Sequence, residues 1–248
     1  MGKQKGALKL RGTHGDFNFA HTADGFIWRE KAKFDKAKFL KNPQIIANIA
    51  EFARAGKAVR LFRSAFETQI TKAKDRRLTP RLQKQMVKVL RSDTTHKRGD
   101  RLITSGDPVH LDQFQCNANA LFGSTLGAAY DVTIDRATGE VMFNVPSFIP
   151  LECMKKPDLA THFTIVTAAS ELDFDGNTFN TAAASTGLMP IDDLASAPVA
   201  LSCMLTPGTG LPVYVVAGLK FTQVENGFTY PLKGDEYNSM CIVKIDHP

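Results

Sequence analysis

The chain has 248 residues, of which 43% are hydrophobic and 23% charged, so we expect a folded protein of one large or two small domains. No apolar run approaches the ~20 residues of a membrane-spanning helix. Charge is divided unevenly: residues 1–101 hold 25 Lys and Arg against 9 Asp and Glu, and residues 102–248 hold 6 against 16. Folding does not require such a division, which indicates how the protein meets its partners.

The first 12 residues are basic and contain no apolar segment of signal-peptide type. We therefore expect a cytoplasmic protein, unless it is exported to the cell exterior without a leader. The four cysteines Cys116, Cys153, Cys203 and Cys241 are widely spaced, with no CxxC pair. Buried free thiols are a better interpretation than zinc ligands or disulfides.

Residues 7–30 alternate between apolar and polar types, with turn signals near residues 12–15 and 23–25. This pattern predicts a meander of about three strands, including one at residues 7–11. Because so small a sheet buries little on its own, it has to pack against something.

A helical hairpin is predicted next. Asn42 and Pro43 mark the start of the first helix, and Thr79 and Pro80 mark the start of the second. The first helix has an apolar stripe at Ile45, Ile49, Phe52, Val59, Phe62 and Phe66. The second has an apolar face at Leu82, Met86, Val89 and Leu90, and an opposite basic face at Arg81, Lys84, Lys88 and Arg91. Each helix should therefore bury one side.

From residue 108 onward the pattern changes to short strands with turn signals, among them Asn226-Gly227. We therefore predict an α+β protein. Its basic region, residues 1–106, would hold the β-meander and helical hairpin, and its acidic domain, residues 107–248, would be an antiparallel β-sandwich.

Catalytic chemistry finds little support. The segment containing Asp173 and Asp175 resembles the DxDGT loop of haloacid-dehalogenase-like phosphatases, but Asn177 stands where that motif has threonine, and a polar hairpin turn explains it better. The six histidines show no metal-ligand spacing, and no GxSxG motif is present. We predict no enzyme activity, cofactor or metal.

The division of charge instead predicts a structural subunit that assembles with itself into a filament or tube. Leu8 and Leu10, followed by Arg11, would add a strand to a neighbouring sheet edge. The basic row Arg81, Lys84, Lys88 and Arg91 would face acidic residues of the next copy. The acidic residues predicted for this contact are Asp173, Asp175, Asp192 and Asp193. The alternative is a nucleoprotein subunit whose basic helical face binds nucleic acid.

Several segments carry a resemblance to a known family: residues 12–17, 24–25, 51–58, 160–163 and 230–233. They resemble a Bacteroidota family with a domain of unknown function, over most of the chain. The resemblance implies a bacterial source and no known catalytic residue. Residues 34–40 are less polar than it leads us to expect.

Overall fold

The computed structural model describes residues 1–31 and 41–248, with only the backbone of residues 234 and 235. Residues 34–40, where a more polar segment was expected, lie outside this described part. The chain forms two compact units, Met1–Ile46 and Ala47–Pro248, which we call the N-terminal unit and the main unit. Helices and antiparallel sheets are both present, so the predicted α+β class is confirmed.

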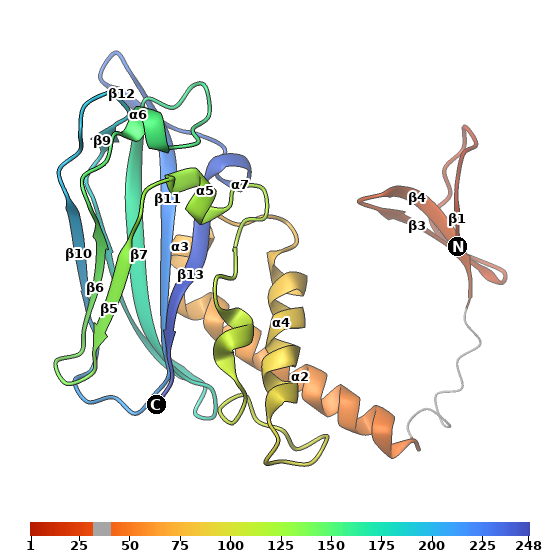
Figure 1. Ribbon diagram of the computed structural model, residues 1–248. Coiled ribbons are helices and arrows are strands. Elements are labelled where there is room, and N and C mark those ends of the chain that lie inside the picture. The colour runs from red at the N-terminus through yellow and green to blue at the C-terminus, as the bar shows by residue number, and fades with distance from the viewer. Residues whose placement is uncertain (32–40) are drawn as a thin grey trace. The chain divides into compact units, whose positions relative to one another are not determined.

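The N-terminal unit contains a four-stranded antiparallel sheet, drawn in red in Figure 1. Its strands are β1 (Gly2–Lys3), β2 (Gly12–His14), β3 (Phe17–Thr22) and β4 (Gly25–Glu30), in the order β1-β4-β3-β2. The meander is therefore larger than predicted. Residues 7–11, predicted as a strand, instead form the connection from β1 to β2.

The helices follow local sequence signals in part. Helix α2 (Pro43–Ala65) starts where predicted, and the Asn42 side chain accepts a hydrogen bond of 3.0 Å from the Gln44 amide. After α3 (Glu67–Ile70), helix α4 (Leu78–Ser92) buries its predicted apolar face. The predicted stripe of α2 is wrong in its first half, because Ile49 is 48% and Phe52 61% exposed.

The main unit holds two further antiparallel sheets that curl into a half-barrel. A three-stranded sheet has the order β10-β6-β5, and a six-stranded sheet has the order β12-β11-β7-β8, with β13 paired to β11 and β9 to β7. The strands are β5 (Asp131–Asp135), β6 (Glu140–Val145), β7 (His162–Asp173), β8 (Thr178–Ser185), β9 (Met189–Pro190), β10 (Val199–Met204), β11 (Val213–Glu225), β12 (Phe228–Pro231) and β13 (Ser239–Asp246).

Four short helical segments lie outside these strands: η1 (Pro108–Leu111) and α5 (Phe122–Leu126) between α4 and β5, α6 (Pro150–Cys153) between β6 and β7, and α7 (Gly234–Tyr237) between β12 and β13. The β11–β12 hairpin turns at Asn226 and Gly227, whose φ angles are 51° and 79°. Both central residues thus have positive φ, which explains why Asn-Gly signals this hairpin in the sequence.

Two hydrophobic cores lie on opposite sides of the six-stranded sheet. Val213, Val215 and Ala217 of β11 belong to the core inside the half-barrel. Tyr214 and Val216 alternate with them and belong to a second core, which they share with α2 and α4. Figure 1 shows α2 and α4 on one side of β7, β11 and β13, and β5, β6 and β10 on the other.

Because the helices and strands share a core, the observed division of the chain differs from the predicted one. The contact-based boundary follows Ile46. The boundary predicted between residues 106 and 107 falls inside the main unit.

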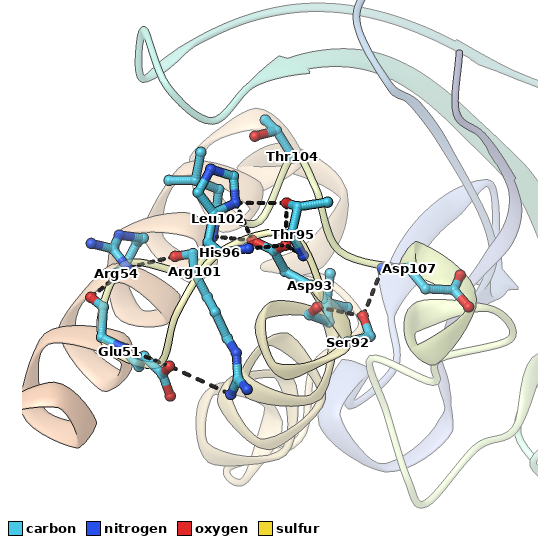
Figure 2. Close-up of polar contacts among 12 residues, drawn as sticks. Glu51, Arg54, Ser92, Asp93, Thr95, His96, Arg101, Leu102, Thr104 and Asp107 are labelled. Carbon is cyan, nitrogen blue, oxygen red and sulfur yellow. Dashed lines mark hydrogen bonds and ion pairs between the residues drawn. The ribbon is translucent and has the colours of Figure 1, made fainter. Parts of the chain in front are cut away.

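The segment after α4, which we call the 93–107 loop, is organised by a buried carboxylate. Asp93 accepts hydrogen bonds from the Thr95 amide at 2.8 Å, the Thr95 hydroxyl at 2.7 Å and the Leu102 amide at 2.9 Å, and lies 2.7 Å from His96 Nδ1 (Figure 2). Burial alone would raise the pKa of Asp93, but these hydrogen bonds outweigh it and hold that pKa well below its usual range.

The same loop is fastened to α2. Glu51 accepts a hydrogen bond of 2.9 Å from the Gly99 amide, and its carboxylate lies 3.6 Å from the Arg101 guanidinium. Arg54 donates to the carbonyl oxygens of Gly99 and Arg101. Polar side chains of α2 thus hold a loop that lies about 45 residues further along the chain.

Candidate assembly interface

The segment predicted to exchange between copies is pinned within its own sheet. The Gln4 side chain accepts a hydrogen bond of 2.8 Å from the Leu10 amide and donates to the carbonyls of Leu10 at 3.2 Å and Ile27 at 3.0 Å. Leu8 lies between these anchored positions and is 87% exposed, in no strand. The side chains of Leu8 and Leu10 are therefore exposed and could contact another chain. Their backbone does not form the strand that was predicted to pair with a neighbouring sheet.

A stronger surface feature is a row of rings on one side of the N-terminal sheet. Strand register pairs Phe19 with Trp28, and His21 with Phe26, across β3 and β4. It also pairs His14 of β2 with Phe17. Paired residues share a face and alternate residues of a strand lie on one side. Six rings therefore occupy the same side, which we call the aromatic face: His14, Phe17, Phe19, His21, Phe26 and Trp28.

Neighbouring rings of this face contact one another. Phe17 and Trp28 meet edge to face with centroids 5.3 Å apart, and His21 stacks on Phe26 at 4.3 Å. Arg11 lies beside the second pair, its guanidinium carbon 5.4 Å from the Phe26 centroid and one of its nitrogens 3.2 Å from His21 Nδ1. Arg11 thus belongs to the aromatic face.

Gly2 provides room for the indole. A Cβ atom at this position would lie 2.6 Å from Trp28 Nε1 and 2.7 Å from the adjacent ring carbon. Any other residue would force the Trp28 ring to move. Glycine in β1 therefore lets the aromatic face extend across the width of the sheet.

Within residues 1–31, no residue covers the aromatic face. None of these residues is buried, and Phe17 and Trp28 are 42% and 37% exposed. The opposite side carries Lys3, Asn18, Ala20, Ile27 and Arg29, a mixed set that suits contact with water. A sheet of one layer is marginally stable, and apolar surface gains free energy only when covered. The aromatic face is therefore the side of this sheet on which a partner would remove the most apolar surface from water.

The four residues of the predicted basic row of α4 have different surroundings. The Arg81 guanidinium pairs with Asp75, donates to the carbonyls of Gln115 at 2.7 Å and Cys116 at 3.1 Å, and lies 5.2 Å from the Phe114 centroid. Its hydrogen bonds therefore tie α4 to the segment that precedes α5. The other three members, Lys84, Lys88 and Arg91, are exposed and form no ion pair with another described residue.

The four predicted acidic residues fall into two separate pairs. Asp173 and Asp175 lie in the turn from β7 to β8, where the Asp173 carboxylate accepts hydrogen bonds from the amides of Asp175 at 3.1 Å and Gly176 at 2.8 Å. Asp192 and Asp193 follow β9, which pairs with the first two residues of β7. Since β7 has 12 residues, its ends lie roughly 35 Å apart. The structure does not bring the two pairs together.

The remaining reactive groups of the described chain have structural surroundings. The segment compared with a phosphatase loop is a tight turn between antiparallel strands, in which Asn177 has a φ angle of 55°. All four cysteines are free, and three are buried. Burial raises the pKa of the Cys116 and Cys241 thiols to about 12, so at neutral pH they carry their protons and are poor nucleophiles.

In the described part of the chain, no group of three or more His, Cys, Asp or Glu side chains could hold a metal ion. Among its helices, none is long and apolar enough to cross a membrane.

Comparisons with known proteins add little. No protein-family model matches the chain, and no curated protein matches it. A solved structure described as "pH-induced modulation of Streptococcus parasanguinis adhesion by Fap1 fimbriae" is 14% identical, covering 45% of this chain and 77% of that chain, with a TM-score of 0.21. A likeness at this level carries no argument about function.

Proposed function

We propose that this protein is a structural subunit without enzyme activity, which assembles with copies of itself into a filament or tube. The observation that carries the proposal is the aromatic face of the N-terminal sheet, which no other residue from 1 to 31 covers. Burying a fully exposed Phe side chain contributes about 1.5–3 kcal/mol, and covering the exposed 42% of Phe17 and 37% of Trp28 would contribute part of such an amount for each. A second copy that covers this face would supply the layer that the N-terminal sheet lacks.

The main unit offers a surface of matching chemistry. Ile49 and Phe52 are exposed three residues apart on α2, so they lie on the same side of that helix. In our proposal the aromatic face of one copy covers these side chains on the next. Donor and acceptor surfaces then differ, so the contact is head-to-tail and repeats without closing unless the rotation happens to form a ring.

Charge would orient the contact. Lys84, Lys88 and Arg91 form an exposed basic row on α4, and the Asp192–Asp193 pair follows β9. Between copies such patches would guide association more than they strengthen it. The finer expectations belong to the same proposal: a β-sandwich arrangement of the sheets in the main unit, and membership of the Bacteroidota family.

A second function, binding of single-stranded nucleic acid, is favoured by one observation. Exposed rings on a sheet, with the Arg11 guanidinium beside them, have the chemistry of a platform on which bases stack. On this alternative the aromatic face would hold bases, and the basic row of α4 would contribute phosphate contacts.

The decisive experiment compares two faces of one sheet. The aromatic variant carries Phe17→Ser and Trp28→Ser, and the control carries Ile27→Ser on the opposite side. We expect polymers of the natural protein and the control in negative-stain images and sedimentation, and monomers of the aromatic variant. Because Trp28 is the sole tryptophan, its fluorescence should shift to the blue on assembly.

Three results would overturn the assembly proposal. One is a natural protein that stays monomeric at all concentrations and salt levels. Another is an aromatic variant that polymerises as well as the control. The third is a purified protein with a 260 to 280 nm absorbance ratio typical of bound nucleic acid and no polymers, which would favour the alternative function.

A further inference from the structure

A lysine occupies an unexpected place on the central strand β11. Tyr214 and Val216 face the core shared with the helices, and Lys220 lies on that same side by strand alternation. The side chain of Lys220 is half-buried. An aliphatic residue here would extend the core, so a charged group that departs from the local pattern points to a function.

Further positive charges lie next to Lys220. Burial lowers the pKa of Lys220, and the nearby charge of Lys72 lowers it further. Lys72 and Lys74 follow α3 and line the same cavity as Lys220. Among the described residues of the cavity wall there is no carboxylate. The three lysines thus line one cavity whose described wall holds no carboxylate.

The cavity is large, and hydrogen bonds hold part of its wall in place. Its volume is about 650 Å³, within the range of small-molecule sites. Asn238 fixes its base, since this buried side chain donates a hydrogen bond of 2.8 Å to the Lys72 carbonyl and accepts one of 2.9 Å from the Phe221 amide. The hydroxyl groups of Thr71 and Thr222 line the wall and can donate to a ligand.

A smaller hollow adjoins this cavity and shares Thr71 and Lys74 with it. Its volume is about 160 Å³, and Arg60, Arg63 and Glu67 also line it. Two guanidinium groups against one carboxylate leave this hollow net positive. The two hollows together suit a ligand with more than one negative group.

We propose that Lys72, Lys74 and Lys220 form a binding site for a small molecule that carries phosphate groups, with room for a second phosphate beside Arg60 and Arg63. A phosphate between the ammonium groups would replace their mutual repulsion by charge-assisted hydrogen bonds. The threonine hydroxyls and the fixed Lys72 backbone preorganise the site. This site is independent of the assembly proposal, because none of its residues belongs to the aromatic face, to the Ile49 and Phe52 surface or to the basic row of α4.

The test uses inorganic pyrophosphate as the probe and isothermal titration calorimetry of the full chain at pH 7 and low salt. We expect one pyrophosphate per chain. The Lys220→Met variant should bind at least tenfold more weakly, and Lys72→Met, at an exposed side chain that folding does not need, should also weaken binding. The matched control Lys84→Met removes an equal charge from α4 and should bind like the natural protein.

Folding is checked by thermal unfolding. Because Lys220→Met removes a half-buried charge, its midpoint should be no lower than that of the natural chain. Absence of pyrophosphate binding to the natural protein would overturn the site. So would equal weakening by Lys84→Met and Lys220→Met, which would show attraction to net charge alone. Binding of a ten-nucleotide single strand without binding of pyrophosphate would overturn it in favour of a nucleic-acid surface.

Discussion

Strands of the N-terminal sheet and of the half-barrel both place alternate residues on opposite faces, yet the aromatic side chains of the two regions differ in burial. Phe163 and Phe221 of the six-stranded sheet are fully buried, whereas Phe17 and Trp28 of the N-terminal sheet are exposed by more than a third. Alternation decides which face of a strand is apolar. A second layer decides whether that face becomes a core.

This difference in burial indicates that the main unit contributes most of the free energy of folding. In the main unit, strand β11 has a hydrophobic core on each side. In the N-terminal sheet, residues 1–31 contribute to neither core. We therefore expect the main unit to unfold cooperatively by itself, and the N-terminal sheet to gain its stability from what it contacts.

The largest expected effect contrasts two phenylalanines. Phe62 is fully buried between Phe66, 4.9 Å away by centroids, and Tyr214, 5.8 Å away, so Phe62→Ala should lower the free energy of unfolding by about 3–5 kcal/mol. Phe17→Ala should change it by less than about 0.5 kcal/mol in the dissociated chain. Urea unfolding followed by circular dichroism measures both. Equal losses would mean that the N-terminal sheet belongs to the cooperative unit.

Next in size is the contrast within α4. Arg81→Met removes a guanidinium that pairs with Asp75 and bonds two carbonyls, and should lower the free energy of unfolding by about 2 kcal/mol. Lys84→Met, on the exposed side, should change it by less than about 0.5 kcal/mol. The same denaturation assay applies. A costly Lys84→Met would reveal a partner for this exposed lysine.

A smaller effect concerns pH. Since the folded-state pKa of Asp93 is lowered, the unfolded chain takes up the proton first as pH falls. The stability that Asp93 contributes is therefore complete above about pH 4 and declines below it. Asp93→Asn should lower the thermal midpoint at pH 7, and its difference from the natural chain should shrink below pH 4. The control Asp158→Asn, at an exposed side chain, should change the thermal midpoint at pH 7 very little.

The smallest global effect is expected for Gln4→Ala. Gln4 holds Leu10 within the N-terminal sheet through two hydrogen bonds, so its loss should free the segment around Lys9 and Arg11. Tryptic cleavage there should become several-fold faster, while the unfolding midpoint of the main unit stays unchanged. A shift of that midpoint would show that the N-terminal sheet stabilises the main unit.

Sequence patterns succeed here where the cause is local. Asn42-Pro43 starts α2, and Asn226-Gly227 turns a hairpin, because backbone geometry and a nearby hydrogen bond decide both. The apolar face of α4 is also correct, since period 3.6 fixes which residues share a side.

Sequence patterns fail where a residue distant in the sequence determines whether a side chain is buried or paired. Phe52 is periodic with the buried residues of α2, but the core begins only further along that helix. Arg81 has the same spacing as Lys84, but it meets Asp75 and two carbonyls from a segment some 35 residues away. The rings of the aromatic face alternate visibly in the sequence, yet only the pairing of β2, β3 and β4 shows that they form one surface.

Because β11 is buried on both sides, the chain can be shortened only at certain positions without exposing a core. A fragment that starts at residue 107 would retain the half-barrel strands but lose α2 and α4. Tyr214, Val216 and Ile242 would then be exposed on one side of the six-stranded sheet, and a large exposed apolar surface of this kind favours aggregation. A cut before α2 preserves every layer, which makes residue 41 the natural start for a soluble truncation.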